Sequence, residues 1–386
     1  MARFFRIALC TLLCLGVSIP SSLALPLEEG TPMTLTAPSA ILMEAETGTV
    51  IFEKNADVRR PAASITKLMT LLLICEGLTQ GNLSLEDPIT VSPYAAGQTG
   101  SQALLDAHAV YPLKDLLKST IIASGNDSAV ALAEYFAGTE EAFVALMNKK
   151  AGEMGLSNTH YINCTGLPAD GQYTSARDVA MISREIAAHS FYFDYSATWL
   201  DSLVHPSGRV TDLTNTNRLV RFYQDCDGFK TGSTNEAKYC LSATAERNGT
   251  RLIAVVLGVP NSQTRFDEAR AMMDYGFATY QRVQVARPGD LTGVKLPVVM
   301  GAREQVDVAL GKGLSMLLRS GQAGKLAFET ELMESVQAPV RAGDELGLVR
   351  VLLEGRVIGE LPAVAAQDVP LPGPLEGFFR VLEQWR

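Results

Sequence analysis

The chain has 386 residues, with 33 Lys and Arg against 42 Asp and Glu, which gives a formal net charge of −9 at pH 7. This acidic balance leaves no basic surplus for binding nucleic acid, and a hydrophobic fraction of 47% with a charged fraction of 19% excludes an intrinsically disordered chain. Because single cores stop growing at about 250 to 300 residues, we expect two domains.

The chain begins with MARFFRIALCTLLCLGVSIPSSLALP, in which Arg3 and Arg6 precede a short apolar run and Ser22-Leu23-Ala24 forms a small-x-small cleavage site. This order predicts a secretory signal peptide over residues 1–24, and hence a mature protein that works outside the cytoplasmic membrane. The alternative is a retained N-terminal membrane helix. No later run of about 18 apolar residues follows, so no further membrane span is expected.

SAILMEAETGTVIFEKN, residues 39–55, predicts a hairpin with a turn at 46–48. PAASITKLMTLLLICEGL, residues 61–78, follows and is apolar nearly all round, which is typical of a buried helix. Ser64 and Lys67 are three residues apart and therefore share one face of this helix. Burying an ammonium is costly, so Lys67 needs polar partners or a lowered pKa. A neutral lysine beside a serine can act as the base that makes the hydroxyl a nucleophile.

Residues 113–190 have a mostly helical pattern, in the segments LKDLLKSTIIAS, DSAVALAEYFAG, EEAFVALMNKKAGEMG and SARDVAMISREIAAH. Within them, Ser124-Gly125-Asn126 stands on a tight loop that enters an apolar helix. Ser124 is a candidate to relay a proton to a leaving group, and Asn126 is a candidate to hold an amide of the substrate. The alternative is that these residues only cap the helix, a position that Ser, Asn and Asp favour.

Strands return with DGFKTGST and with YCLSATAERNGTRLIAVVLG, and a last helix is expected from about 266 to 280. A strand edge that carries Lys230 and Thr231 can meet a carboxylate by charge and by hydroxyl. Gly232 leaves room for a substrate to lie along the strand as an added strand. The backbone N–H groups of Ser64 and Ser233 would then form an oxyanion hole. Antiparallel strands at both ends of a helical middle predict an α/β sandwich.

Four cysteines follow the leader, and none suggests a metal site. Cys75 lies on the predicted buried helix and is interpreted as a core thiol. Cys226 and Cys240 flank DGFKTGSTNEAKY, and the sequence leaves open whether they form a disulfide between neighbouring strands. The chain has no Cys-x-x-Cys pair and no phosphate-binding loop motif, and its histidines are scattered without ligand spacing (His108, His160, His189 and His205). No metal ligand is therefore predicted.

Beyond residue 285 the pattern changes to short alternating runs separated by Gly, Pro and Asp, which predicts a small all-β domain over 285–370. A hairpin is expected where 348–353 and 357–361 flank Glu354-Gly355-Arg356. This domain carries no candidate catalytic cluster and is interpreted as a spacer.

The tail 371–386, LPGPLEGFFRVLEQWR, has the pattern of an amphipathic helix. This helix either docks on its own domain or contacts a membrane through 375–386. Its position at the end of a secreted chain favours the membrane contact.

Three motifs occur in order: Ser64-x-x-Lys67, Ser124-x-Asn126 and Lys230-Thr231-Gly232. This set resembles that of the active-site serine penicillin-binding proteins. PAASITKLMT, SGNDSAVALAE, ADGQYTSARDVA and DGFKTGSTNEAKYCLSATA narrow the resemblance to the low-molecular-mass D-alanyl-D-alanine carboxypeptidases, over about residues 36–282. The implied fold class is α/β: a serine β-lactamase/DD-peptidase-like antiparallel sheet with a helical subdomain, plus a small C-terminal all-β domain. The implied domains are a catalytic domain at 25–284 and the spacer at 285–370.

The resemblance also implies a chemistry. Ser64 would be acylated by the penultimate D-alanine of a peptidoglycan pentapeptide, Lys67 would be the general base, and Ser124 and Lys230 would share proton transfer to the leaving amine. Thr231 and, in QTRFDEAR, Arg265 would bind the terminal carboxylate. β-Lactams would acylate Ser64, and no metal or organic cofactor is needed. The rivals are a class A β-lactamase, whose Glu-x-x-Leu-Asn motif is absent from the sequence, and a cell-wall binding protein without catalysis.

Overall fold

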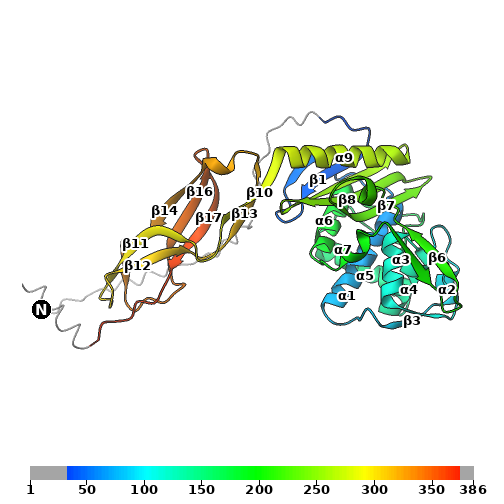
Figure 1. Cartoon of the computed structure of the whole chain (residues 1–386), viewed down its shortest axis with the longest axis horizontal. Helices are drawn as coiled ribbons and strands as arrows, with labels where there is room; N and C mark the ends of the chain where they lie inside the picture. Colours follow the sequence, from blue (N-terminus) through cyan, green and yellow to red (C-terminus); the bar gives the residue numbers. More distant parts are fainter. Residues whose placement is uncertain (1–32, 374–386) are drawn as a thin grey trace, which may run out of the picture.

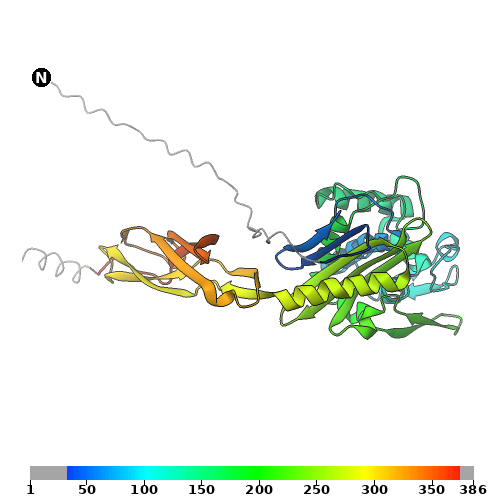
Figure 2. The ribbon, with the colours of Figure 1, turned by 90° about the horizontal axis from the view of Figure 1, so that it is seen from above.

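The computed structural model describes residues 33–373, which form two bodies joined end to end (Figures 1 and 2). The larger body contains a sheet with helices on both faces, and the smaller body is built of strands. This arrangement confirms the predicted fold class. The predicted signal peptide at 1–24 and the predicted membrane-contacting helix at 375–386 lie outside the described residues. Within 33–373, no helix is both long enough and apolar enough to cross a membrane.

A five-stranded antiparallel sheet forms the centre of the larger body. Its order is β2-β1-β9-β8-β7, so the N-terminal hairpin pairs with a strand from the other end of this body. The register of Ala40 opposite Lys54 confirms the predicted hairpin, and Gly48 adopts a φ of 71° in its turn. β7 forms one edge of the sheet. The strands are β1 (Ser39–Glu44), β2 (Val50–Lys54), β7 (Cys226–Thr234), β8 (Lys238–Arg247) and β9 (Thr250–Val259).

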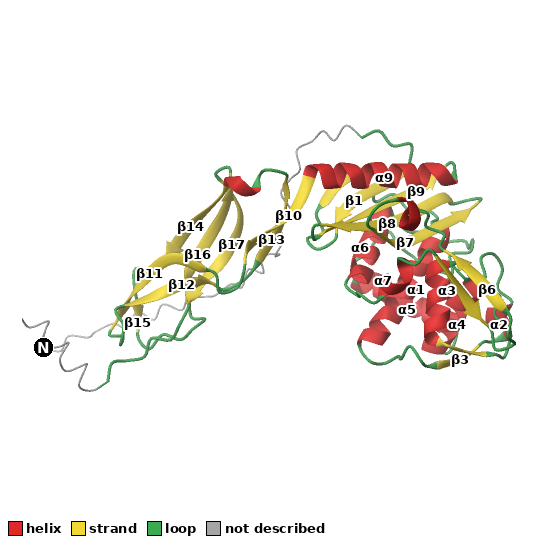
Figure 3. Ribbon diagram, viewed as in Figure 1, coloured by secondary structure: helices red, strands yellow, loops and turns green. Residues whose placement is uncertain are grey.

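Side chains of the sheet point alternately into two cores. On β1, Ile41 and Met43 pack with the helical subdomain, whereas Ala40 and Leu42 pack against the last helix of this body, α9 (Ser262–Thr279). Successive side chains of a strand face opposite sides of the sheet, so apolar residues at every position predict a sheet covered on both faces. Figure 3 shows α9 along one face and the other large helices on the opposite side.

The helical subdomain confirms the helices predicted between residues 113 and 190. α6 (Ala176–Ala187) packs directly on β1 and β9. The remaining helices and turns of the larger body are η1 (Ala63–Thr66), α1 (Lys67–Thr79), α2 (Pro93–Ala96), α3 (Leu113–Ile122), α4 (Asn126–Ala137), α5 (Glu140–Glu153), α7 (Tyr192–Ser196) and, on the α9 side of the sheet, α8 (Leu219–Phe222). Two small hairpins complete it, β3 (Pro88–Thr90) with β4 (Val110–Pro112) and β5 (Leu200–Val204) with β6 (Val210–Thr214).

Helix α1 runs through the middle of this subdomain and contacts α3, α4, α5 and α6. Its residues 67–75 are all buried, which explains why the sequence is apolar on every side. Cys75 is an unbonded thiol in this core, and burial raises its pKa to about 12. A thiol that stays protonated is unreactive, as the interpretation of Cys75 as a packing residue requires.

Cys226 and Cys240 are also unbonded thiols. In the β7–β8 ladder, Cys226 lies opposite Ala245 and Cys240 lies opposite Gly232. Five residues along β8 therefore separate Cys240 from the partner of Cys226, a distance of roughly 16 Å at about 3.3 Å per residue. A disulfide requires Cα atoms within about 7 Å. The bridge that the sequence left open is excluded by this register.

The smaller body contains a six-stranded sheet of order β14-β16-β17-β12-β11-β15 around its own apolar core. The predicted hairpin at 348–361 is confirmed, with Leu353 opposite Arg356. The strands are β11 (Leu291–Val299), β12 (Gln305–Leu310), β14 (Leu326–Leu332), β15 (Val336–Gln337), β16 (Glu345–Leu353) and β17 (Arg356–Ala365), with a short turn η2 (Ala323–Lys325).

A two-stranded ladder, β10 (Tyr280–Ala286) with β13 (Leu314–Arg319), connects the two bodies. Its first residue, Tyr280, and Leu317 are buried in the core beneath α9. Arg282 forms an ion pair with Glu46 in the β1–β2 turn, and its backbone N–H donates to Thr250 Oγ1 over 2.8 Å. These contacts hold the connecting strands against the larger body.

Candidate active site

Ser64 lies in the short turn η1, and Lys67 is the first residue of α1. Lys67 Nζ is 3.0 Å from Ser64 Oγ, so the two predicted residues are in hydrogen-bond contact. The turn places Ala63 at a φ of 50°, in the left-handed region that alanine rarely adopts. Strain of this kind persists only where the surrounding structure enforces it, and it concentrates at functional sites.

Lys67 is fully buried and has two further partners. Its Nζ donates to Asn126 Oδ1 over 2.5 Å and to the carbonyl oxygen of Thr165 over 2.7 Å. Burial lowers the pKa of Lys67 to about 7, although the charges of Cys164 and Asp127 act in the opposite direction. The lysine thus has both features that its burial called for, polar partners and a lowered pKa, and a large fraction of it is a neutral amine at pH 7.

Ser124 occupies the tight loop between α3 and α4, at a φ of 64°. Its side chain is buried, and its Oγ has no hydrogen-bond partner among residues 33–373. Buried hydroxyls are rarely left unpaired, so this one is available to a bound molecule. The cap position of α4 belongs to Gly125, with no side-chain cap bond. The alternative that Ser124 only caps this helix is therefore wrong.

Asn126 is the first residue of α4, and its amide is held at both atoms. Oδ1 accepts from Lys67, and Nδ2 donates to the carbonyl oxygen of Thr99 over 2.6 Å. The backbone N–H of Asn126 donates to the carbonyl oxygen of Ser101 over 2.7 Å. These contacts orient Oδ1 toward Lys67 and leave one N–H of Nδ2 for another acceptor.

β7 brings the third motif to the same place. Lys230 is fully buried, and its Nζ has no hydrogen-bond partner within the described residues. Burial, together with the nearby positive charges of Lys67 and Arg265, lowers its pKa well below the usual value. An anion bound there would reverse this effect, because an opposite charge favours the ammonium form. Thr231 is nearly buried, and Ser233 is exposed on the same strand.

Gly232 allows β7 to lie directly against η1. A Cβ on this glycine would be 2.4 Å from the carbonyl oxygen of Ala62 and 3.1 Å from the backbone nitrogen of Ser64. Such distances exclude any side chain, so the glycine is required for the close approach of the two backbones. The approach brings the strand segment 231–233 beside the N–H of Ser64.

Arg265 projects from the first turns of α9 and is mostly buried. Its guanidinium donates to the carbonyl oxygens of Gly232, over 3.2 Å, and Cys240, over 3.4 Å. Burial lowers its pKa to about 10, so it remains positively charged at pH 7. The arginine therefore contacts β7 at Gly232 and places a positive charge beside this strand, which suits a carboxylate.

Three positions that support the candidate residues were not identified from the sequence, and they lie in the turn 163–166. The carbonyl of Thr165 accepts from Lys67, and Asn163 Oδ1 accepts from the backbone N–H groups of Thr165 and Gly166. Gly166 adopts a φ of 83°, and a Cβ on it would be 1.9 Å from the carbonyl oxygen of Ala63. Asn163 and Gly166 are both residues that favour turns, but nothing local indicates that this turn meets η1.

Asp127 is a fourth such position. It is fully buried directly after Asn126, and its carboxylate accepts from the backbone N–H groups of Ala103, over 2.9 Å, and Leu105, over 3.1 Å. A buried carboxylate normally requires such donors. Asp127 thereby ties α4 to the loop that supplies the carbonyls for Asn126.

Two family models match the chain. The model described as D-alanyl-D-alanine carboxypeptidase covers residues 27–261, and the model described as penicillin-binding protein 5, C-terminal domain, covers residues 280–371. The D-alanyl-D-alanine carboxypeptidase DacF of Bacillus subtilis is 37% identical over 350 residues, which are 90% of each chain. The D-alanyl-D-alanine carboxypeptidase DacC of Escherichia coli is 33% identical over 354 residues, which are 87% of this chain and 86% of that one.

The solved structure of penicillin-binding protein 5 from Haemophilus influenzae is similar with a TM-score of 0.76 and 30% sequence identity. The match covers 88% of this chain and 99% of that one. The similarity therefore extends over the sheet with its helices and over the smaller β body.

Proposed function

The chain belongs to the peptidase S11 family of D-alanyl-D-alanine carboxypeptidases, and from this premise we propose that it removes the terminal D-alanine of peptidoglycan pentapeptides through an acyl-enzyme on Ser64. The observation that carries the proposal is the contact of 3.0 Å between Ser64 Oγ and Lys67 Nζ. The lysine is buried and its pKa is about 7, as a base acting at neutral pH requires.

Acylation begins when Ser64 Oγ attacks the carbonyl carbon of the penultimate D-alanine while its proton passes to the neutral Nζ of Lys67. The developing oxyanion accepts from the backbone N–H groups of Ser64 and Ser233, in agreement with the close approach of η1 and β7 at Gly232. The C–N bond then breaks. The leaving amine takes a proton from Ser124 Oγ, which is replenished from Lys67 or Lys230, and water later hydrolyses the ester.

Recognition of the substrate falls to the groups that lack protein partners or border the site. Lys230 Nζ, buried and without a hydrogen-bond partner in the described chain, is assigned to the terminal carboxylate together with the Thr231 hydroxyl. Arg265 adds positive charge from beneath β7. We assign the second N–H of the Asn126 amide to a carbonyl of the peptide stem.

The same arrangement is proposed to react with β-lactams, whose strained amide takes the place of the D-alanyl-D-alanine bond. The test is release of free D-alanine from a synthetic acyl-D-Ala-D-Ala peptide, with peptide mapping of the penicillin adduct. D-Alanine release and an adduct on the peptide containing Ser64 would support the proposal. The absence of both products would contradict the proposal. An adduct without release of D-alanine would point to another peptide substrate.

The proposed base predicts the pH dependence. The kcat/KM for D-alanine release should rise with pH and reach half of its maximum near pH 7, the pKa of Lys67. The sign follows from the mechanism, because the ammonium form that dominates below this pKa has no lone pair to accept the Ser64 proton. Rates measured from about pH 5 to about pH 9 test this. A rise centred near the ordinary lysine pKa, or a flat profile, would exclude Lys67 as the base.

The location and the outer segments of the chain remain proposals. The predicted signal peptide at 1–24 supports an enzyme that acts outside the cytoplasmic membrane, with a catalytic domain at 25–284. The β domain at 285–370 is proposed to be a spacer. The tail 371–386 is proposed to contact the outer face of that membrane peripherally, through its residues 375–386. Fractionation of cells with and without the segment 375–386 tests the membrane contact.

A further inference from the structure

The amide of Asn126 depends on a loop that none of the three motifs includes, residues 99–106 between α2 and β4. Two carbonyl oxygens of this loop, those of Thr99 and Ser101, accept from Asn126 Nδ2 and from its backbone N–H. Gly100 adopts a φ of 83°, and a Cβ on it would be 2.9 Å from Asn126 Nδ2. A displacement of this loop would therefore move the amide that presents Oδ1 to Lys67.

The inner side of loop 99–106 is bound to α4. The fully buried carboxylate of Asp127 accepts from the N–H groups of Ala103 and Leu105, so both of its oxygens are used to hold the loop. These bonds connect the loop with the residue directly after Asn126. The loop 99–106 and the start of α4 thus form one unit, and these bonds leave the outer side of the loop without support.

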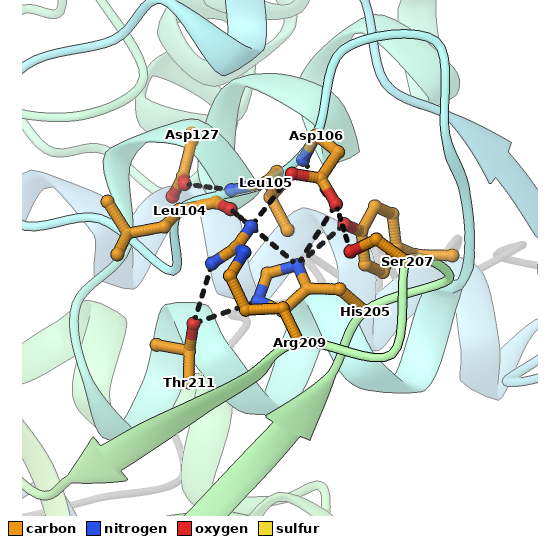
Figure 4. A network of polar contacts seen from close by, with 9 residues as sticks. Leu104, Leu105, Asp106, Asp127, His205, Ser207, Arg209 and Thr211 are labelled. Atoms are coloured by element: carbon orange, nitrogen blue, oxygen red, sulfur yellow. Dashed lines mark hydrogen bonds and ion pairs between the residues drawn. The ribbon is translucent and has the colours of Figure 1, made fainter.

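The outer side is bound by Arg209, in the turn between β5 and β6. Its guanidinium donates to the carbonyl oxygen of Leu104 over 2.5 Å and to Asp106 Oδ1 over 2.8 Å. Ser207, in the same turn, donates to Asp106 Oδ2 over 3.0 Å. Figure 4 shows Arg209 reaching from this turn to Leu104 and Asp106, with Asp127 on the other side of Leu105.

The turn itself has a rigid support. His205 is buried, and its ring nitrogens contact Tyr111 OH over 2.7 Å and Thr211 Oγ1 over 2.8 Å. The Tyr111 hydroxyl also accepts from the backbone N–H of Asp106 over 3.1 Å. Burial lowers the pKa of His205, and the charge of Arg209 acts in the same direction. The histidine is therefore neutral at pH 7 and fixes the hairpin against β4.

We propose that Arg209 is a positioning residue for acylation: it closes loop 99–106 onto the start of α4, so that Asn126 presents Oδ1 to Lys67. The inference rests on the proposed function, because it assigns Lys67 as the base for Ser64. Arg209 acts through Asp106, the main chain of the loop and Asn126. It is 105 residues away in sequence from Leu104, whose carbonyl it contacts.

A role of Arg209 in positioning Asn126 can be distinguished from a role in stabilising the fold. The side chains of Arg209 and Asp106 each remain 38% exposed, and exposed ion pairs contribute little to stability. Loss of the arginine should therefore leave the fold almost unchanged, whereas the reacting groups tolerate little displacement. The two roles predict different combinations of melting temperature and rate.

The test compares Arg209→Gln with Arg184→Gln, a matched control. Arg184 also holds a turn through main-chain carbonyls, those of Ala45 and Glu46, but at the β1–β2 turn. The rate of acylation by a chromogenic cephalosporin is measured as a function of pH, with the melting temperature and the hydrogen exchange of the loop 99–106. Arg209→Lys keeps the charge and is the conservative variant.

Arg209→Gln is expected to lower the acylation rate about tenfold or more with a change in melting temperature within about 3 °C. The pH of half-maximal rate should rise by about half a unit, because water that enters beside Lys67 weakens the burial that lowers its pKa. Exchange at Ala103 and Leu105 should become faster. Arg209→Lys should recover part of the rate, and Arg184→Gln should remain within about twofold of the parent.

A parent-like rate and pH profile in Arg209→Gln would overturn the inference, as would an equal loss in Arg184→Gln. The parent protein separates this result from the proposed function. If the parent neither releases D-alanine nor forms a β-lactam adduct, the proposed function fails. The exchange measurement then still decides whether Arg209 holds the loop, and unchanged exchange would overturn that part as well.

Discussion

Replacing Ser64 by alanine is expected to lower the kcat for D-alanine release on the order of a million-fold, to the level that binding and the oxyanion hole alone sustain. The fold should be almost unaffected, because the Ser64 hydroxyl has one hydrogen bond in the described structure, that from Lys67. D-Alanine release under saturating substrate measures the loss. Intact-protein mass spectrometry after incubation with penicillin should show no adduct.

Ser124→Ala is the comparison that makes this result specific. Ser124 relays a proton in the proposed mechanism and forms no bond with the substrate carbon, so its loss should cost only about a hundredfold to ten-thousandfold. Penicillin should still label that variant, although slowly. If Ser64→Ala kept more than about one part in a thousand of the parent rate, or still formed a stable adduct, the nucleophile would have to be another residue.

Replacing Gly166 by alanine is expected to destabilise the protein by about 3 kcal/mol and to lower the acylation rate about a hundredfold. Gly166 has a φ of 83°, and an added Cβ would be 1.9 Å from the carbonyl oxygen and 2.4 Å from the carbonyl carbon of Ala63. Both are backbone atoms that no rotamer change can move. The turn 163–166 and η1 must therefore separate, which displaces the Thr165 carbonyl from Lys67 and moves Ser64.

Gly138→Ala is the matched control for this prediction. Gly138 has a φ of 86°, nearly the same as that of Gly166, and an added Cβ would meet nothing within 4 Å. It should lose about 1 kcal/mol from the left-handed conformation alone and keep the parent rate of acylation. Urea unfolding and β-lactam acylation measure both effects. Equal behaviour of the two variants would show that the contact with Ala63 has no role.

Much of the fold could be predicted from local patterns. The apolar run of 61–78 indicated a buried helix, and α1 is buried along residues 67–75. The hairpins at 39–55 and 348–361 followed from short turns between apolar strands, and both are present. The order of the strands in the sheet could not be predicted in this way. The pairing of β1 with β9 joins segments about 200 residues apart, and no local periodicity encodes that contact.

The site divides in the same way. Ser64 and Lys67 are one helical turn apart, so their contact could be predicted from spacing. The contact between Lys67 and Thr165 spans 98 residues, and it arises because the turn 163–166 packs on η1. The alternative of a disulfide between Cys226 and Cys240 was open in the sequence, and the register of β7 and β8 excluded it.

The sequence by itself determined the candidates for the chemistry, since Ser64, Lys67, Ser124, Asn126 and Lys230-Thr231-Gly232 stand in motifs whose spacing is local. Only the tertiary structure decided how these groups are placed and buried. The pKa of about 7 for Lys67 is caused by its burial, to which two distant segments, 126–127 and 164–165, contribute neighbours. The orientation of Asn126 depends on a loop tied by Asp127 and Arg209. Desolvation and close packing are sums over contacts between distant segments, so they exist only once the chain has folded.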